Sequence, residues 1–351
     1  MASIVYGICG TGHGHARRAA AVMRQFPQHE FLVVTWGDAL PFIDDRHQIC
    51  VCPNPESPIV RHRVDTWGMI RTSVTVLPLA PWHLRRVREA MTAFRADVAI
   101  SDYEFFVPRA SRSLGVPCLS LDHQHVITAG SHDVPWCERP AFLATWALVR
   151  GLHSRASSFV ATSFYEPIRA GRSPIRILPP LIRPEVLARS PRVGDHAVAY
   201  QGFTTFDAFS AFLASAPRRV IAYGPWPAGR RGNARFEPFS DTAFLDALAS
   251  CAYVICGGGH TLISEALFLG KPVLSFPIAS QYEQVLNARY LAKLGLGFHA
   301  RDRRPTARLL EEFESRVPDF RAAMNGRRFC GNEEVFAAVA YFIERGVLPA
   351  V

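Results

Sequence analysis

The stretch CGTGHGHARR, residues Cys9–Arg18, places three glycines and two histidines between an apolar run, Ile4–Ile8, and an alanine-rich segment, Ala19–Met23. The apolar run is typical of a buried strand, and the alanine-rich segment favours a helix. A glycine-rich loop between such elements lets the backbone approach a ligand closely and leaves free N–H groups at the helix start. We therefore predict that the chain opens with a strand, a functional loop and a helix.

Strand-like runs and helix-length segments continue to alternate through the first half of the chain, which indicates βαβ units and a parallel sheet. The proline-rich segment 176–194 interrupts this pattern, and a second series of the same kind follows. The predicted strands are Ser3–Cys9, His29–Val34, Asp97–Asp102, Val116–Leu121 and Ser158–Ser163, then His196–Gly202, Arg218–Gly224, Ala234–Phe239, Ala252–Gly258, Pro272–Ile278 and Gly295–Ala300.

These patterns predict an α/β protein of two doubly wound domains. We expect an N-terminal domain over residues 1–178, a linker over 179–194, a second domain over 195–332 and a C-terminal helix, 333–351, that could pack back on the first domain. Ligands of open α/β sheets bind at the carboxyl ends of the strands. We therefore expect a cleft between the carboxyl edges of two sheets.

Composition narrows the function classes. The 351 residues carry 39 Lys+Arg against 30 Asp+Glu, a formal net charge of +9. These charges form no polybasic block, so they argue only weakly for nucleic acid and suit an anionic substrate or an acidic membrane surface. The eight cysteines show neither a disulfide framework nor a zinc pattern. With no leader and no apolar window of ~18 residues, we predict a cytoplasmic protein.

The first loop reads GxGxG rather than the GxGxxG of dinucleotide-binding folds. Gly12 and Gly14 can approach a substrate closely, and His13 and His15 are expected to project from the loop. Asp38 follows the second strand and could imitate the acid that binds a ribose, so this loop alone leaves a nicotinamide enzyme open.

A second glycine run lies in CGGGHTLISEALFLGKPVLSFPIASQYEQVLNA, residues Cys256–Ala288. Gly258 and Gly259 end a strand, and His260 and Thr261 open a helix whose positive end can receive a diphosphate. Glu265, one turn later, can accept hydrogen bonds from both hydroxyls of a ribose.

The segment after the next strand is rich in amides and acids. Gln281, Glu283 and Gln284 suit a polyhydroxylated ring. The alternative is a helix cap in which Ser280 pairs with Glu283 and no ligand is needed.

Together these motifs resemble the GT-B nucleotide-sugar glycosyltransferases, in particular the MurG-like family 28 group. Within that group they are most similar to a bacterial and archaeal branch with GxGxGHxxR near the start and PxxxQxEQxxNA near the end. Here these motifs read GTGHGHARR, Gly10–Arg18, and PIASQYEQVLNA, Pro277–Ala288.

The resemblance implies two Rossmann-like domains and transfer of a sugar, with inversion, from a UDP-sugar to an acceptor hydroxyl or amine. It implies that His15 is the general base and that Asp102, which closes a strand, orients it. An imidazole held by a carboxylate can accept the proton of an attacking hydroxyl. Glu104, His123 and His125 are reserve candidates, and we expect His123 to be a satisfied structural residue instead.

For the donor, the resemblance implies that the amides around Gly259–Thr261 hold the diphosphate and that Glu265 binds the ribose. Phe239 would lie where relatives read uracil with main-chain groups, and Glu283 with Gln284 would hold the sugar. No metal or other cofactor is expected, because the helix end and His260 replace the cation. Alternatives are a nucleotide-sugar hydrolase, an epimerase, or a binding protein without turnover.

The segment Trp67–Met91 combines apolar residues with Arg71, Arg85, Arg86 and Arg88. It could meet anionic lipid at the inner face of a membrane. The alternative, an ordinary strand and helix with solvated arginines, is slightly preferred. The acceptor, which could be a small molecule or linked to a lipid, is not predicted.

Overall fold

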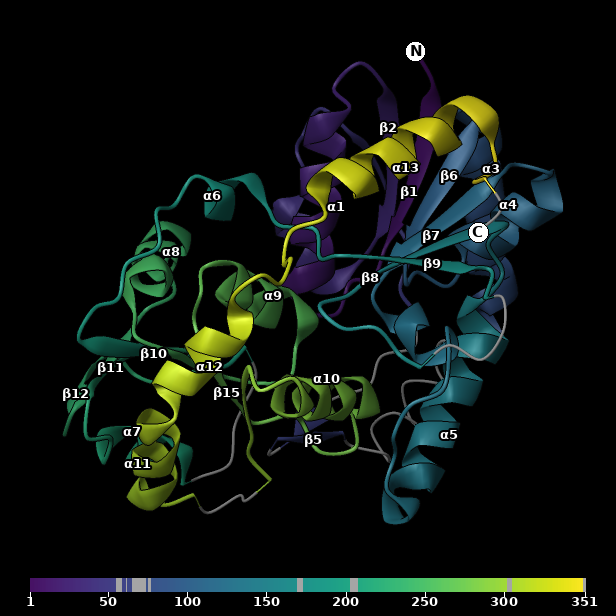
Figure 1. Ribbon diagram of the computed structural model, residues 1–351. Coiled ribbons are helices and arrows are strands. Elements are labelled where there is room, and N and C mark those ends of the chain that lie inside the picture. The colour runs from purple at the N-terminus through teal and green to yellow at the C-terminus, as the bar shows by residue number, and fades with distance from the viewer. Residues whose placement is uncertain are drawn as a thin grey trace. The chain divides into compact units, whose positions relative to one another are not determined.

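The computed structural model describes residues 1–54, 59–60, 62–64, 74, 77–168, 173–202, 208–301 and 305–349. The chain forms two compact units, and Figure 1 labels their helices and strands. Unit 1 comprises Met1–Ser57, Thr66–Arg183 and Cys330–Val351, and unit 2 comprises Pro58–Asp65 and Pro184–Phe329.

Unit 1 is built on a sheet of seven strands in the order β3-β2-β1-β6-β7-β8-β9, all paired in parallel. The chain moves outward on one side through β2 and β3 and then returns to pair β6 with β1, so the switch point of the topology lies between β1 and β6. The strands are β1 Ser3–Ile8, β2 Glu30–Thr35, β3 Gln48–Val51, β6 Val98–Asp102, β7 Cys118–Asp122, β8 Ser158–Thr162 and β9 Ile175–Leu178.

Both faces of this sheet are covered, because alternate residues of a strand point to opposite faces. Ile4 and Tyr6 of β1 share a core with α1 and α13, whereas Val5 shares a core with α3 and α4. Figure 1 shows α13 lying along the sheet of unit 1. The helices are α1 His13–Gln25, η1 Gly37–Phe42, η2 Leu77–Leu79, α3 Ala80–Ala93, α4 Val107–Leu114, η3 Gln124–Thr128, η4 Trp136–Glu138, α5 Arg139–Leu148, η5 Val149–His153 and α13 Asn332–Arg345.

Unit 2 repeats the design with a sheet in the order β12-β13-β11-β10-β14-β15-β16, in which only β12 and β13 are antiparallel among the described pairs of that sheet. The strands are β10 His196–Tyr200, β11 Arg219–Tyr223, β12 Gly229–Arg231, β13 Ala234–Glu237, β14 Val254–Cys256, β15 Val273–Ser275 and β16 Gly297–His299. The helices are α6 Pro184–Leu187, α7 Phe209–Ala214, α8 Asp241–Ser250, α9 His260–Phe268, α10 Tyr282–Lys293, α11 Ala307–Ser315 and α12 Val317–Met324. The predicted α/β architecture with two doubly wound sheets is confirmed.

A short hairpin, β4 Ile59–Val60 and β5 Arg63–Val64, belongs to unit 2 although its sequence lies within the first third of the chain. Arg63 forms a parallel bridge with Ala279, and the amide of Ala279 donates to the carbonyl of His62 at 3.1 Å. The hairpin is therefore tied to the segment that leads into α10.

Candidate functional site

A buried cluster of three charged or ionisable side chains lies at the switch point of unit 1. Nδ1 of His15 lies 2.7 Å from Oδ1 of Asp102. Arg18 donates to both carboxylate oxygens of Asp102, from Nε at 2.8 Å and from Nη2 at 2.6 Å. Asp102 is fully buried and Arg18 nearly so, while the side chain of His15 keeps 15% of its surface exposed. The imidazole is the member of the cluster that solvent can reach.

The fold explains why these residues meet. Asp102 is the last residue of β6 and pairs in register with Ile8, the last residue of β1. The amide of Cys9 donates to the carbonyl of Asp102 at 3.0 Å, which fixes the loop to the strand end. His15 and Arg18 are three residues apart in α1 and so share one face of the helix. The sequence predicted His15 with Asp102 but missed Arg18, for which the i, i+3 spacing was the available signal.

The charges in the cluster determine which nitrogen of His15 carries the proton. Burial by itself lowers the pKa of Arg18, but the charge and hydrogen bonds of Asp102 outweigh it and leave that pKa above its usual value. Asp102 is then an ionised carboxylate, which can only accept hydrogen bonds. In the neutral imidazole, Nδ1–H of His15 then donates to Asp102, and Nε2 carries the free lone pair, to which no described residue bonds.

Arg18 also reduces the electrostatic stabilisation that Asp102 can give to a protonated His15. Its Nη2 lies 3.1 Å from Nδ1 of the imidazole, so a fixed positive charge stands beside the ring. An imidazolium formed during proton transfer is attracted by Asp102 and repelled by Arg18. We infer that Asp102 acts mainly by fixing the orientation and the tautomer of His15.

Positions 10 and 12 of the first loop need glycine for different structural reasons. A Cβ on Gly10 would lie 2.2 Å from the carbonyl oxygen of Trp36, and Gly12 has a φ of 77° in the left-handed region. Helix α1 begins at His13, so the two histidines belong to its first turn, and the expectation that they project from the loop was wrong. His13 is exposed, with its ring 5.0 Å from that of Phe42.

The nicotinamide alternative loses support at this loop. The carboxylate of Asp38 accepts a hydrogen bond from the amide of Gly12 at 3.0 Å. It therefore occupies an amide at the start of α1 that a dinucleotide phosphate would need, and its negative charge would repel that phosphate.

The reserve candidates have other partners. The carboxylate of Glu104 accepts the amides of Phe106 and Val107 at 2.8 and 2.6 Å and so caps α4. Burial raises the pKa of Glu104, and these amides lower it only in part. Nδ1 of His123, which is fully buried, lies 2.8 Å from the carbonyl oxygen of Thr162.

His125 forms a second, buried pair with Asp122. Their Nδ1 and Oδ2 atoms lie 2.7 Å apart, and Nε2 lies 3.1 Å from Oγ of Ser154. Burial raises the pKa of Asp122, but the charge and hydrogen bonds of His125 outweigh it and bring that pKa well below its usual value. His125 is 1% exposed, and its contact with Ser154 links η3 to the residue that follows η5.

An aromatic stack extends from His15 to η5. Tyr103 follows Asp102 in the left-handed region, with a φ of 53°, a strained conformation for a bulky residue. Its ring is nearly parallel to that of His15, at 6.5 Å between centroids, and to that of His153, at 3.9 Å. Nδ1 of His153 is buried and has no hydrogen-bond partner. The strained backbone therefore places Tyr103 between the candidate base and a second histidine.

His153 predicts a pH dependence of stability. Burial, followed by the charge of His125, lowers the pKa of His153 from 6.5 to about 3. Between these values the unfolded chain holds a proton that the folded chain does not, so stability falls with falling pH by up to about 1.4 kcal/mol per pH unit. His153→Phe keeps the ring and loses the titration. Urea unfolding between pH 7 and pH 4 should show a shallower loss for the variant, and equal slopes would contradict the assignment.

In unit 2, the glycine run after β14 is tied to the segment before α10. Oε1 of Gln284 accepts the amide of Gly258 at 3.0 Å and that of Ile278 at 3.1 Å, and Nδ2 of Asn287 donates to the carbonyl of Gly258 at 2.9 Å. The oxygen of Gln284 is thus engaged within the protein, and only its amino group could serve a ligand.

Gly258 and Gly259 differ in what a side chain would meet. A Cβ on Gly258 would lie 2.5 Å from the carbonyl oxygen of Gln284, whereas a Cβ on Gly259 meets nothing within 4 Å. Gly259 also has an ordinary φ of −66°. Packing therefore requires a glycine at position 258. At position 259 only a ligand that approaches the backbone closely would require one.

These two glycines give a paired prediction. Gly258→Ala should destabilise unit 2 by about 1–3 kcal/mol, because α10 must shift. Gly259→Ala should unfold at the same denaturant concentration as the native chain and bind nucleotide more weakly. Denaturant unfolding with calorimetric titration of UDP separates the two effects. A stable Gly259→Ala protein with unchanged affinity would show that no ligand approaches this position.

Helix α9 begins at His260 with Gly259 at its N-cap, no side-chain cap and no acidic residue in its first turn. Its N-terminus therefore keeps its partial positive charge. His260 is buried with Nε2 3.2 Å from Oγ of Ser264, and Thr261 is partly exposed. Glu265 is only 2% exposed, so it does not point into bulk water.

The alternative interpretation, a cap of α10 by Ser280 and Glu283, is not what the structure shows. Gln281 is the N-cap residue and no side chain caps the helix, while Ser280 is in the left-handed region with a φ of 70°. Oε1 of Gln281 is buried without a hydrogen-bond partner, and Glu283 is partly exposed. A strained residue thus directly precedes the polar start of α10.

Phe239 follows β13 and is 44% exposed. Its ring lies 5.8 Å from that of Tyr200, 6.4 Å from that of Tyr223 and 5.8 Å from that of Phe244. The carboxyl ends of β10, β11 and β13 therefore carry an aromatic cluster with one open face.

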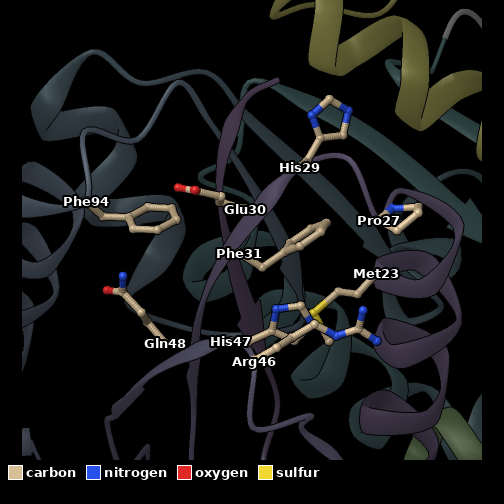
Figure 2. Close-up of a pocket in the computed structure, with 9 residues that line it drawn as sticks. All are labelled: Met23, Pro27, His29, Glu30, Phe31, Arg46, His47, Gln48 and Phe94. Carbon is tan, nitrogen blue, oxygen red and sulfur yellow. The ribbon is translucent and has the colours of Figure 1, made fainter.

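The cavity in Figure 2 lies elsewhere in unit 1. It encloses about 310 Å³ and is lined by Phe31, His29, His47, Arg46 and other residues near the first residues of β2 and β3. These are the amino ends of the strands, at the edge opposite Asp102, whereas doubly wound sheets bind ligands at the carboxyl ends. It is not the candidate site.

The remaining expectations concern thiols, metals and membranes. All eight cysteines are free thiols. Within the described ranges, no three His, Cys, Asp or Glu side chains gather around a metal position, and no helix is long and apolar enough to cross a bilayer. Of the segment Trp67–Met91, residues 67–73 and 75–76 lie outside the described residues, and Leu79 and Trp82 are 52% and 55% exposed.

Comparison with known proteins identifies similar chains. A family model described as Glycosyl transferase family 1 matches residues 2–318. An uncharacterized glycosyltransferase of Methanosarcina acetivorans is 24% identical over 327 residues, covering 84% of this chain and 82% of that protein.

Solved structures share the architecture. The glycotransferase of kitacinnamycin superimposes with a TM-score of 0.68 at 14% identity and covers 99% of this chain and 100% of its own. UGT2 of Phytolacca americana, solved with UDP-2fluoro-glucose and pterostilbene, gives 0.67 at 14%, covering 97% and 99%. MurG of Acinetobacter baumannii gives 0.57 at 15%, also covering 97% and 99%. At these identities the likeness shows the fold, which is the predicted GT-B fold.

Proposed function

Since this chain belongs to glycosyl transferase family 1 and is therefore a glycosyltransferase, we propose that it moves a sugar from a UDP-sugar to an acceptor hydroxyl or amine with inversion. The observation that carries this proposal is the His15–Asp102 pair, in which Nδ1 faces the carboxylate and no described residue bonds to Nε2. The GxGxGHxxR and PxxxQxEQxxNA motifs further support a place in the MurG-like branch.

In the proposed reaction, Nε2 of His15 accepts the proton of the acceptor hydroxyl as its oxygen attacks the anomeric carbon. The bond from that carbon to the diphosphate breaks, and the nucleoside diphosphate leaves with the electron pair. Asp102 holds the imidazole through Nδ1–H, at 2.7 Å, so that Nε2 faces the acceptor.

For donor binding, we propose that unit 2 supplies the groups. The uncapped start of α9 would stabilise the charge of the diphosphate, both in the donor and as it leaves. The open space at Gly259 leaves room for that approach. Glu265 would bind the ribose, Phe239 would lie against the base, and Gln281, Glu283 and the amino group of Gln284 would hold the sugar.

Glu265 provides a test of the donor site. Glu265→Gln keeps the size of the side chain but replaces two charge-assisted hydrogen bonds with weaker ones, so UDP affinity should fall about ten- to hundredfold. Calorimetric titration of UDP measures this, with Glu237→Gln, on β13, as the control variant. An unchanged dissociation constant would exclude Glu265 from the ribose site.

His15 could instead activate a water molecule, which would make the protein a nucleotide-sugar hydrolase. The discriminating experiment incubates the enzyme with UDP-sugars and no acceptor. Slow release of free sugar that acceptors suppress supports transfer, whereas rapid stoichiometric release supports hydrolysis.

A further inference from the structure

Helix α5 of unit 1, with the sequence RPAFLATWAL, is apolar and yet has no buried residue. Around it, Trp136 is 82% exposed, Leu143 58%, Leu152 45%, Leu148 42% and Trp146 38%. In Figure 1, α5 projects from the sheet of unit 1 instead of lying along it. We call these five residues the α5 apolar surface.

The exposed residues cover most of the circumference of the helix. Ala141, Ala144 and Ala147 are exposed as well, and within the apolar part of the helix only Phe142 and Thr145, which share one face, are partly covered. A helix that packs on a protein shows one apolar face, whereas a helix that is apolar all round belongs in an apolar medium. Its ten residues are about half the length that crosses a bilayer, so it can only enter the surface of one.

The charges beside the α5 apolar surface are mainly positive. Over residues 136–155 the chain carries Arg139, Arg150 and Arg155 against Glu138. Among the described residues, no carboxylate pairs with the guanidinium of Arg139 or Arg150. Arg155 lies close enough to Arg109 to contribute, after burial, to lowering the pKa of that residue to about 10. The apolar helix is thus bordered by Arg139 and Arg150, for which the described part of the chain supplies no anionic partner.

We propose that α5 docks this protein on a membrane that contains anionic lipid, with its tryptophans and leucines in the interface and its arginines at the lipid phosphates. Tryptophan is favoured at this depth because its ring is apolar and its N–H can reach water. A second copy of the chain is a poorer occupant, since it would bring two sets of unpaired arginines together. The α5 apolar surface does not include the exposed residues Leu79 and Trp82. Docking through it would not require the proposed donor site or the proposed base.

Two leucines offer a matched test. Leu148 in α5 and Leu187 in α6 are both 42% exposed, so Leu148→Glu and Leu187→Glu make the same change at the same exposure. Flotation with vesicles of phosphatidylcholine and phosphatidylglycerol should show binding of the native chain and of Leu187→Glu. Binding of Leu148→Glu should be weaker on the order of tenfold.

The charge is tested in the same assay. Arg150→Glu should weaken binding several-fold and Arg345→Glu, at an exposed position of α13, should not, while vesicles of phosphatidylcholine alone should bind poorly. Absence of binding by the native chain, equal binding by both leucine variants, or equal binding to both kinds of vesicle would overturn the proposal. So would a dimer, seen by light scattering, that Leu148→Glu dissociates.

Discussion

Replacement of His15 by alanine is expected to lower the turnover number roughly 10²- to 10⁴-fold and to leave UDP affinity nearly unchanged. The side chain of His15 is the most exposed of the buried cluster, at 15%, and its Nδ1 lies 2.7 Å from Oδ1 of Asp102. In the proposed reaction, an acceptor without this imidazole must lose its proton to water, whereas the proposed donor groups in unit 2 are not altered. Steady-state kinetics with a responsive acceptor, together with calorimetry of UDP, measure both quantities.

His13 supplies the control for this prediction. It lies in the same helical turn, is exposed, and contacts Phe42 rather than a carboxylate. His13→Ala should keep its turnover within about twofold. If the two variants lost the same activity, the general effect of altering the start of α1 would explain the result, and His15 would not be the base.

Replacement of Arg18 by methionine is expected to destabilise unit 1 by about 3–5 kcal/mol, because it leaves the carboxylate of Asp102 buried without a cation. Methionine approximates the length of the arginine stem, so loss of charge accounts for most of the effect. The double variant Arg18→Met with Asp102→Asn should recover a large part of the loss, because the unpaired charge is then absent. Urea unfolding of the single and double variants measures these differences.

A surface ion pair serves as the comparison. Arg85 donates to Glu89 at 2.8 Å, but both side chains are more than half exposed. Arg85→Met should therefore change stability by no more than about 0.5 kcal/mol. A loss below about 1 kcal/mol for Arg18→Met would mean that water reaches Asp102 in the folded chain.

The pairing of His15 with Asp102 was predicted from the resemblance to the glycosyltransferases, and the parallel sheet explains it. Carboxyl ends of parallel strands meet at one edge, Asp102 ends β6, and His15 lies in the helix that follows β1. The sequence did not show how Arg18 neutralises the pair, because burial of a charge depends on elements far apart in the chain. Nor did it show that α1 begins at His13, since two glycines and a histidine are weak indicators of a helix.

The donor segment shows a second limit. Gln284 was predicted to hold a sugar, yet its oxygen joins the glycine run after β14 to the segment before α10. One sequence cannot distinguish an amide that binds a ligand from one that joins two loops, because both need the same side chain at the same strand end. Gly258 and Gly259 were likewise indistinguishable until the atoms around each Cα were known.

The return of the chain to unit 1 after unit 2 has a consequence for synthesis on the ribosome. Val335, Val339 and Phe342 of α13 complete the core beside β1, and they are translated after all of unit 2. Part of the interior of unit 1 therefore stays exposed to solvent or to chaperones until unit 2 has emerged from the ribosome. All segments of unit 2 have been translated once Phe329 is added, so unit 2 can fold first. Unit 1 begins first in the chain but completes its fold last.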